Sequence, residues 1–285
     1  MTKELLLIGD FAGVGKVSFS VMTPILTKQH RTLNYLPTAV VSNSFDYGDA
    51  VVQELTEFMK NSVNMWQKHN FQFDLVTTGF LFSPEQVAII QSLLTSQKIK
   101  PFLIADPIMG DLGELYAGLT PDLVKGVRAM LPLADLIIPN LTEALLILGE
   151  EAQYHHATEE RVFSWISQLH ALGAKSILIT SIELDGEFFI FGYHEKEDVY
   201  FKVPYQMIPI HFGGTGDIFT SLMVNELLEN PDQTLQSMVE RSAKTISDIL
   251  MQEEKRLRGI IDEVYLQNYL EKLQTSYLQE HHAHQ

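Results

Sequence analysis

The chain has no cysteine among its 285 residues, and basic residues are scarce, with 20 Lys and Arg against 36 Asp and Glu. The absence of cysteine excludes disulfides, thiolate metal ligands and cysteine nucleophiles, so any metal must be held by oxygen or imidazole. The net charge of -16 argues against a nucleic-acid partner, because phosphate backbones are bound mainly by clustered Lys and Arg. Neither a long apolar run nor a signal peptide is present, which predicts a cytoplasmic protein with no membrane partner.

The chain also lacks a P-loop, although the stretch GDFAGVGKVS at residues 9–18 resembles one. A P-loop needs a glycine five positions before its Gly-Lys pair and Ser or Thr directly after the lysine. Counted from Gly15 and Lys16, those two positions hold Asp10 and Val17. Neither residue fits, so this first glycine loop needs another explanation.

Short β-rich runs alternate with segments of helical period, which predicts βαβ units. With 46% hydrophobic residues, a chain of this length can bury the core of one α/β domain. We therefore expect one domain over residues 1–278, with a central, mostly parallel sheet and helices on both faces, and a disordered tail at 279–285. The predicted strands are 5–8, 39–42, 75–78, 102–105, 136–138 and 176–180.

Further elements follow from turn and cap signals. Residues 186–205 predict an antiparallel hairpin at the sheet edge. Ser83-Pro84, Thr120-Pro121 and Thr142-Glu143 indicate helix starts. The final third predicts helices over 218–228, 232–251 and 254–278.

Polar residues follow the predicted strands, at the edge where ligands bind to open parallel sheets. Taken singly, each has an alternative explanation, because Asp and Asn are common in turns and at helix starts. Together they predict one polar rim. Its members are Asp10, Asn43, Asp106, Asp111, Asn140, Glu143 and Ser181, and Gly79 with Phe80 follows the third strand at the same edge.

A second glycine loop, FGGTGDIF at residues 212–219, leads into the predicted helix over 218–228. Its glycines leave backbone N–H groups unshielded, and the helix N-terminus adds a positive dipole end, so the loop predicts an anion site. Asp217 falls in the first turn, where the dipole is expected to keep it ionised at neutral pH and able to accept a proton. A purely capping role explains its position equally well.

These parts are the ones that phosphoryl transfer requires. Residues 214–216 would donate hydrogen bonds to the phosphate, and Asp217 would accept the proton of an alcohol. Oxygen ligands suited to Mg²⁺, directly or through its waters, follow the inner strands: Asp106, Asp111, Asn140 and Glu143.

Six blocks of the sequence resemble the ribokinase-like superfamily: the last, the second glycine loop, resembles the signature of the whole superfamily, and the other five resemble its pyridoxal kinase branch. They are LPTAVVSNSFDYG (36–48), TTGFLFSPEQ (77–86), ADPIMGDLGELY (105–116), IIPNLTEALLI (137–147), ILITS (177–181) and FGGTGDIF (212–219). With the first strand they cover most of the chain, and the first and third blocks are the more specific. The resemblance implies a commonly homodimeric kinase that uses ATP and Mg²⁺ to phosphorylate the 5′-hydroxymethyl group of pyridoxal, pyridoxine or pyridoxamine.

The resemblance also implies roles for individual positions. Asp217 corresponds to the catalytic base, and its anion hole comprises Gly214, Thr215 and Gly216. The substrate-binding positions are Asp10, Thr38, Phe80 and Tyr116. The nucleotide-binding positions are Asp106, Asp111, Asn140, Thr180, Ser181, Gly214 and Gly216. The metal-linked positions are Asp106 and Glu143, and whether a monovalent cation assists stays open.

Three positions depart from that family. Asp10 stands where a ring-binding serine is usual, Phe80 stands where many members have tyrosine, and Ile138 replaces a polar residue. A carboxylate at position 10 predicts a preference for pyridoxamine or another cationic vitamer, because a cation would gain a charge-assisted hydrogen bond there. Alternatively, Lys16 pairs with Asp10 and leaves it structural.

Two other functions stay open. Hydroxymethylpyrimidine kinases of the same superfamily take a similar flat heteroaromatic alcohol, although those that also phosphorylate pyridoxal use a lid cysteine, which this chain lacks. The other alternative is a non-catalytic protein that binds pyridoxal phosphate. Asp217 argues against it, because a binding protein needs no base beside the phosphate. It also stays open whether the hairpin at 186–205 covers ATP.

Overall fold

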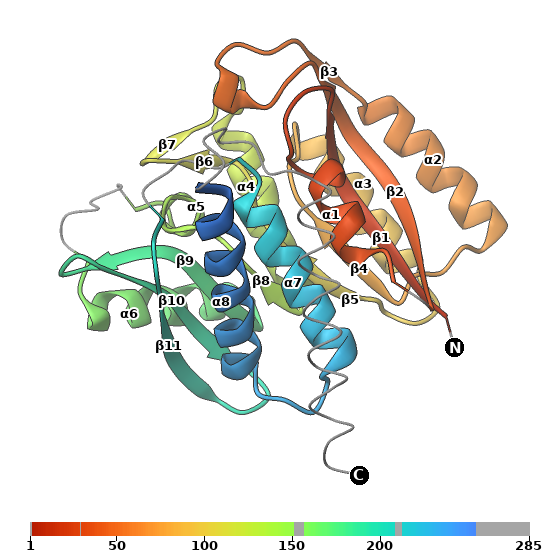
Figure 1. Ribbon diagram of the computed structural model, residues 1–285. Coiled ribbons are helices and arrows are strands. Elements are labelled where there is room, and N and C mark those ends of the chain that lie inside the picture. Colours follow the sequence, from red (N-terminus) through yellow and green to blue (C-terminus); the bar gives the residue numbers. More distant parts are fainter. Residues whose placement is uncertain (1, 29, 151–156, 209–212, 255–285) are drawn as a thin grey trace.

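The computed structural model describes residues 2–28, 30–150, 157–208 and 213–254, which form a central sheet between two layers of helices (Figure 1). The sheet has nine strands in the order β11-β10-β9-β8-β5-β4-β1-β2-β3. Its strands are β1 (Lys3–Ala12), β2 (Arg31–Val41), β3 (Val52–Glu54), β4 (Leu75–Thr78), β5 (Phe102–Ala105), β8 (Leu136–Ile137), β9 (Ser176–Leu184), β10 (Glu187–His194) and β11 (Val199–Tyr205).

The interior of the sheet is parallel and both of its edges are antiparallel. β1 pairs in parallel with β2 and β4, and the parallel pairing continues through β5, β8 and β9. β3 runs antiparallel to β2 at one edge, and β10 and β11 form the predicted antiparallel hairpin at the other. The mostly parallel sheet and the edge hairpin are thus confirmed. A small ribbon of β6 (Gly110–Asp111) and β7 (Glu114–Leu115) was not predicted.

Helices cover both faces, as predicted. One face carries α2 (Thr56–His69), α3 (Pro84–Ser96), α4 (Pro121–Met130), α5 (Leu141–Leu148) and α6 (Glu159–Ala171), with short 3-10 turns at Phe45–Tyr47 and Leu131–Leu133. The other carries α1 (Phe19–Leu26), α7 (Thr215–Glu229) and α8 (Leu235–Glu254). In β1, Leu6 and Ile8 pack into the first core, whereas Leu5 and Leu7 pack into the second. The continuous apolar run therefore reflects a strand buried on both faces.

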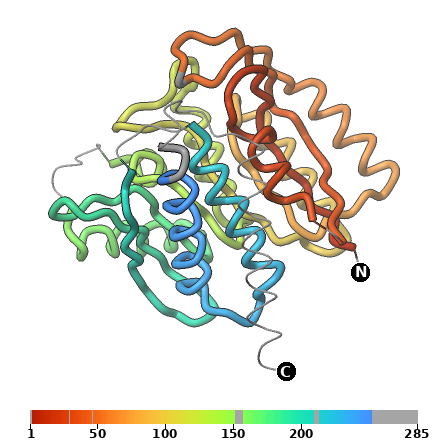
Figure 2. Tube along the Cα trace, viewed as in Figure 1, coloured from red at the N-terminus to blue at the C-terminus, as the bar shows by residue number. Residues whose placement is uncertain are grey.

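Segments far apart in the sequence meet in the middle of the molecule. In Figure 2 the first 70 residues (red to orange) lie at one end of the sheet and the green hairpin lies at the other, with the blue C-terminal helices packed between them. No helix in the described ranges is both long enough and apolar enough to cross a membrane. The predicted helix over 254–278 and the tail at 279–285 lie, beyond Glu254, outside the described residues.

The cap signals are confirmed in part. The Ser83 hydroxyl accepts a hydrogen bond from the Gln86 N–H at the start of α3, and α4 begins at Pro121. The start predicted at Thr142-Glu143 is wrong, because Asn140 is the N-cap of α5. Asn140 Oδ1 accepts from the Glu143 N–H (2.9 Å), while Glu143 Oε2 accepts from the Asn140 N–H (2.8 Å), which is a complete capping box.

Candidate active site

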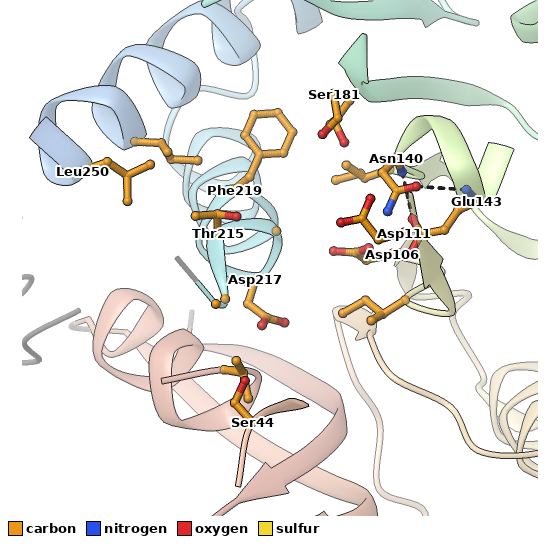
Figure 3. A pocket seen from close by; sticks show the side chains of 18 of the residues that line it. Ser44, Asp106, Asp111, Asn140, Glu143, Ser181, Thr215, Asp217, Phe219 and Leu250 are labelled. Atoms are coloured by element: carbon orange, nitrogen blue, oxygen red, sulfur yellow. Dashed lines mark hydrogen bonds between the residues drawn. The ribbon is translucent and has the colours of Figure 1, made fainter. Parts of the chain in front are cut away.

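A cavity of about 430 Å³ lies beyond the carboxyl ends of the parallel strands. It brings together all but one of the side chains and glycines that the sequence predicts for the site. Figure 3 shows Asp217 and Thr215 on one side, with the acidic residues that follow the inner strands on the other. The predicted residues that line it are Asp10, Phe80, Asp106, Asp111, Tyr116, Asn140, Glu143, Thr180, Ser181, Gly214, Thr215, Gly216 and Asp217.

The exception is Thr38, which is fully buried and does not line the cavity. Its hydroxyl donates to the carbonyl of Phe80 (2.8 Å), and its own carbonyl accepts from Nε2 of Gln86 (2.9 Å). Thr38 therefore fixes the loop that carries Phe80, and its predicted contact with a substrate has no support in this geometry.

The second glycine loop forms the N-terminus of α7 at the cavity, although Phe212 lies outside the described residues. Gly214 is the N-cap, with φ of 83°. A Cβ at this position would lie 2.2 Å from the main-chain oxygen of Lys16, so only glycine fits. At Gly216 a Cβ would point toward Oδ2 of Asp106, 3.9 Å away. The helix end thus faces the acidic wall with its N–H groups unshielded.

The first glycine loop packs against the second, which explains its composition. Gly15 has φ of 103°, and a Cβ there would lie 2.7 Å from Cβ of Ser44. The Lys16 carbonyl oxygen occupies the position that a side chain at residue 214 would need. The glycines of residues 9–18 therefore serve the packing of this loop, which contributes Asp10 and Val17 to the cavity across from Asp106 and Glu143.

Asp217 is buried in the first turn of α7. Its Oδ2 accepts a hydrogen bond from the main-chain N–H of Ser18 (2.7 Å). Its pKa is raised to about 8, mainly by burial and also by the charges of Asp106 and Asp10, although the Ser18 hydrogen bond lowers it. The expectation that Asp217 is ionised at neutral pH is therefore wrong for the unliganded protein, because the loss of hydration outweighs the helix dipole.

Asp106 and Glu143 form the opposite wall. Oδ2 of Asp106 accepts from the hydroxyl of Thr220 (2.8 Å), and burial raises its pKa to about 7. Burial, and then the charge of Asp106, raise the pKa of Glu143 well above its usual range. Besides its capping bond, Glu143 accepts from the Met109 N–H through Oε1 (3.2 Å). Sequence reasoning missed Thr220, which lies on α7 after Asp217. Its hydroxyl connects this helix to Asp106 on the opposite wall.

The electrostatics of the cavity are one-sided. Five carboxylates line it, and no Lys, Arg or His is found among the described residues of its lining. A phosphate entering this space must therefore be held by main-chain N–H groups and by a cation that comes with it. No group of three or more His, Asp or Glu in the described part of the chain is placed to hold a metal by itself. The carboxylates are Asp10, Asp106, Asp111, Glu143 and Asp217.

Sequence reasoning missed the apolar half of the cavity, which lies between the end of β11 and the helices α7 and α8. In Figure 3, Phe219 and Leu250 stand across from Ser181. Burial raises the pKa of Tyr205, which ends β11, to about 12, while a hydrogen bond with Ser181 lowers it. In the sequence, the lining residues of α7 and α8 recur at helical spacing, which is also the pattern of residues that pack in the core. The apolar lining comprises Ile190, Tyr205, Met207, Ile208, Phe219, Ala243, Ile246 and Leu250.

The other end of the cavity is aromatic. Phe80 and Phe45 face each other with ring centroids 6.2 Å apart, and Tyr116 also lines the cavity. Val41 and Ile108 complete the apolar wall there. The site therefore has an aromatic end, a polar centre with the glycine loop and carboxylates, and an apolar slot.

Comparison with known proteins gives consistent matches. Residues 35–261 match the phosphomethylpyrimidine kinase family. A pyridoxal kinase of Arabidopsis thaliana is 32% identical over 183 residues, which are 61% of this chain and 57% of the Arabidopsis protein. A structure from Bacteroides thetaiotaomicron, assigned as a phosphomethylpyrimidine kinase and crystallised with pyridoxal, is 30% identical, with a TM-score of 0.86 over 96% of each chain. The pyridoxal kinase of Lactobacillus plantarum is 25% identical, with a TM-score of 0.84 over 99% of each chain.

Proposed function

The chain belongs to the phosphomethylpyrimidine kinase family, and we propose that it uses MgATP to phosphorylate the 5′-hydroxymethyl group of a vitamin B6 compound: pyridoxal, pyridoxine or pyridoxamine. One observation carries the proposal. The unshielded N-terminus of α7 and the carboxylate of Asp217 open into the same cavity as the acidic residues that follow β5 and β8. The similarity to two pyridoxal kinases and to a structure that contains pyridoxal supports this acceptor.

The division of the cavity supports an assignment for each reactant. The aromatic end, with Phe80 and Phe45, suits a flat pyridine ring. The apolar slot beside Tyr205 and Leu250 suits the adenine of ATP, with Thr180 and Ser181 at its edge. The phosphates then lie between the two, at residues 214–216. In this arrangement the end of the edge hairpin borders the nucleotide.

The reaction follows from these positions. The acceptor oxygen forms a bond to the γ-phosphorus as the bond between that phosphorus and the β,γ-bridging oxygen breaks, and ADP leaves. Asp217 takes the hydroxyl proton, and the N–H groups of residues 214–216 stabilise the negative charge on the transferring group. Asp106 and Glu143 present hard oxygens that would hold a magnesium ion, and that ion would supply positive charge at this acidic wall.

Asp217 must lose its proton before it can act as a base, and its pKa in the unliganded protein is about 8. Two of the causes that raise this pKa are the negative charges of Asp106 and Asp10. Burial is the largest cause, and cations bound beside Asp106 and Asp10 would offset the two charges and so lower the pKa of Asp217 toward neutrality.

A second candidate acceptor is hydroxymethylpyrimidine. The match of residues 35–261 to a family described as phosphomethylpyrimidine kinase favours it. Homodimeric assembly and a cytoplasmic location stay predictions, of which the first is checked by light scattering in solution.

The test is a panel of alcohols assayed with MgATP, comprising the three vitamers and hydroxymethylpyrimidine. We expect phosphorylation of the vitamers, and we expect Asp217→Asn to lower kcat by about 10²- to 10⁴-fold while nucleotide affinity is retained. Asp122→Asn is the matched control, because Asp122 is an exposed carboxylate on α4 whose partner is Lys125. Phosphorylation of hydroxymethylpyrimidine alone would favour the second acceptor, and near-normal turnover by Asp217→Asn would refute the assigned base.

A further inference from the structure

The end of β1 carries an unusual local arrangement around Asp10. The register between β1 and β2 shifts between Gly9 and Phe11, so Asp10 lies opposite a bulge-like irregularity at which β2 carries one extra residue. Bulges re-aim a side chain relative to its neighbours and are frequent beside active sites. Here the result is a carboxylate that lines the cavity yet is only 8% exposed.

Ser18 connects this carboxylate to Asp217. Its side chain hydrogen bonds to Asp10, and its main-chain N–H donates to Oδ2 of Asp217 (2.7 Å). To do both, Ser18 adopts φ of 49°, a conformation that non-glycine residues rarely take. Gly9 admits the serine hydroxyl, because a Cβ there would lie 2.7 Å from Ser18 Oγ. The strand irregularity, Gly9 and the positive φ of Ser18 together allow Ser18 to hydrogen bond to both Asp10 and Asp217.

No cation from the described residues offsets the charge of Asp10. Burial raises its pKa, and only hydrogen bonds, from Ser18 and from its own backbone, lower it. The alternative in which Lys16 neutralises Asp10 therefore has no support. An ionised carboxylate that has lost most of its hydration is stabilised most by a ligand that brings a positive charge.

We infer that Asp10 is a specificity-determining residue that binds a cationic group of the acceptor, and that Ser18 is a positioning residue that holds Asp10 and Asp217 at a fixed separation. The acceptor class is an aromatic alcohol with an ammonium group close to its hydroxymethyl group. Pyridoxamine has this arrangement, whereas pyridoxine carries a neutral hydroxyl in place of the amine. This inference rests on the proposed function.

The experiment measures kcat/KM for pyridoxamine and pyridoxine in the wild type and in Asp10→Asn, Asp10→Ser and Ser18→Ala. We expect the wild type to prefer pyridoxamine. A hydrogen bond to a charged group contributes about 1.5–3 kcal/mol, so Asp10→Asn should lower the ratio of the two kcat/KM values by about 10- to 100-fold, mainly through KM. Ser18→Ala keeps the main-chain N–H that Asp217 accepts and should lower the same ratio by a smaller factor.

Asp111→Asn is the control within the cavity, because it removes a carboxylate from the side assigned to the nucleotide and should lower both activities by the same factor. An unchanged ratio in Asp10→Asn, or equal losses for the two acceptors, overturns the inference. The wild-type ranking needs no variant to fold, and a preference for pyridoxine would overturn the inference by itself. Failure to phosphorylate either vitamer would instead refute the proposed function.

Discussion

Replacement of the ionisable carboxyl group of Asp217 by an amide should make the unliganded protein more stable even though it removes the catalytic base. The isosteric change Asp217→Asn keeps an oxygen that accepts the Ser18 N–H, so the hydrogen bond is retained. What is lost is the cost of keeping a proton on a buried carboxyl group near Asp106 and Asp10, which the unfolded chain would release at neutral pH. The wild-type protein bears this cost in the absence of ligands, because catalysis requires the base.

The magnitude follows from proton linkage. The pKa of Asp217 is about 8 in the folded protein, whereas an aspartate in the unfolded chain has the ordinary value of 3.8. Between these values the folded state keeps a proton that the unfolded state has lost, so stability from this group is fully present below about pH 4 and declines as pH rises toward 8. From pH 5 to pH 7 the wild type should lose about 2 to 3 kcal/mol of its unfolding free energy through this residue, because a full proton difference changes stability by about 1.4 kcal/mol per pH unit.

The assay is urea denaturation at pH 5, 6, 7 and 8 for the wild type, Asp217→Asn and the surface control Asp122→Asn, without nucleotide or magnesium. The advantage of Asp217→Asn over the wild type should grow from pH 5 to pH 7 by about 2 to 3 kcal/mol. Asp122→Asn should not reproduce this growth. A constant difference between Asp217→Asn and the wild type across this range would show that Asp217 is ionised in the folded protein, and the argument from burial would fail.

Two further outcomes are expected. Gly214→Ala should abolish phosphorylation and lower the melting temperature, because its φ of 83° and the 2.2 Å approach of the Lys16 carbonyl exclude a Cβ; a variant with normal kcat and melting temperature would show that the two loops move apart at no cost. For the neutral acceptor pyridoxine, kcat/KM should rise about tenfold per pH unit below the Asp217 pKa of about 8, because only the ionised base is active; a flat profile between pH 6 and pH 8 would contradict an unliganded base with that pKa.

The sequence was sufficient to predict the sheet and the position of the site. The predicted strands at 75–78 and 102–105 coincide with β4 and β5, because short apolar runs bounded by turn residues leave little choice of register. The convergence of Asp10, Asp106 and Asn140 then followed from topology alone, since the carboxyl ends of parallel strands share one edge. Almost the whole predicted site lies in one cavity for that reason.

Other features depend on tertiary contacts that a linear pattern does not contain. β2 begins at Arg31, eight residues before the predicted start, because β1 supplies parallel partners for the polar stretch RTLNYL. α1 contains Pro24 and follows a serine with positive φ, so local signals did not indicate a helix there. The apolar slot was missed because Phe219 and Leu250 have the same helical spacing as core residues.

The pKa of Asp217 was predicted in the wrong direction for a related reason. The helix dipole is a local property that can be read from sequence, whereas desolvation depends on how many other elements close over the carboxylate. Here burial is the largest cause, the charges of Asp106 and Asp10 add to it, and the Ser18 N–H opposes them only in part.

The two glycine loops and the acidic wall have one physical explanation. A cavity that collects five carboxylates and no described basic side chain repels a bare nucleotide, so main-chain N–H groups must provide the fixed positive potential that a P-loop lysine provides elsewhere. Those groups reach the phosphate only where no Cβ intervenes, as at Gly216, whereas glycine at 214 permits the close approach of the loop at 9–18. The remaining charge must be met by cations that arrive with the reactants. The carboxylates that destabilise the unliganded protein are therefore the same groups that make the binding of a metal-bound nucleotide and of a cationic acceptor mutually favourable.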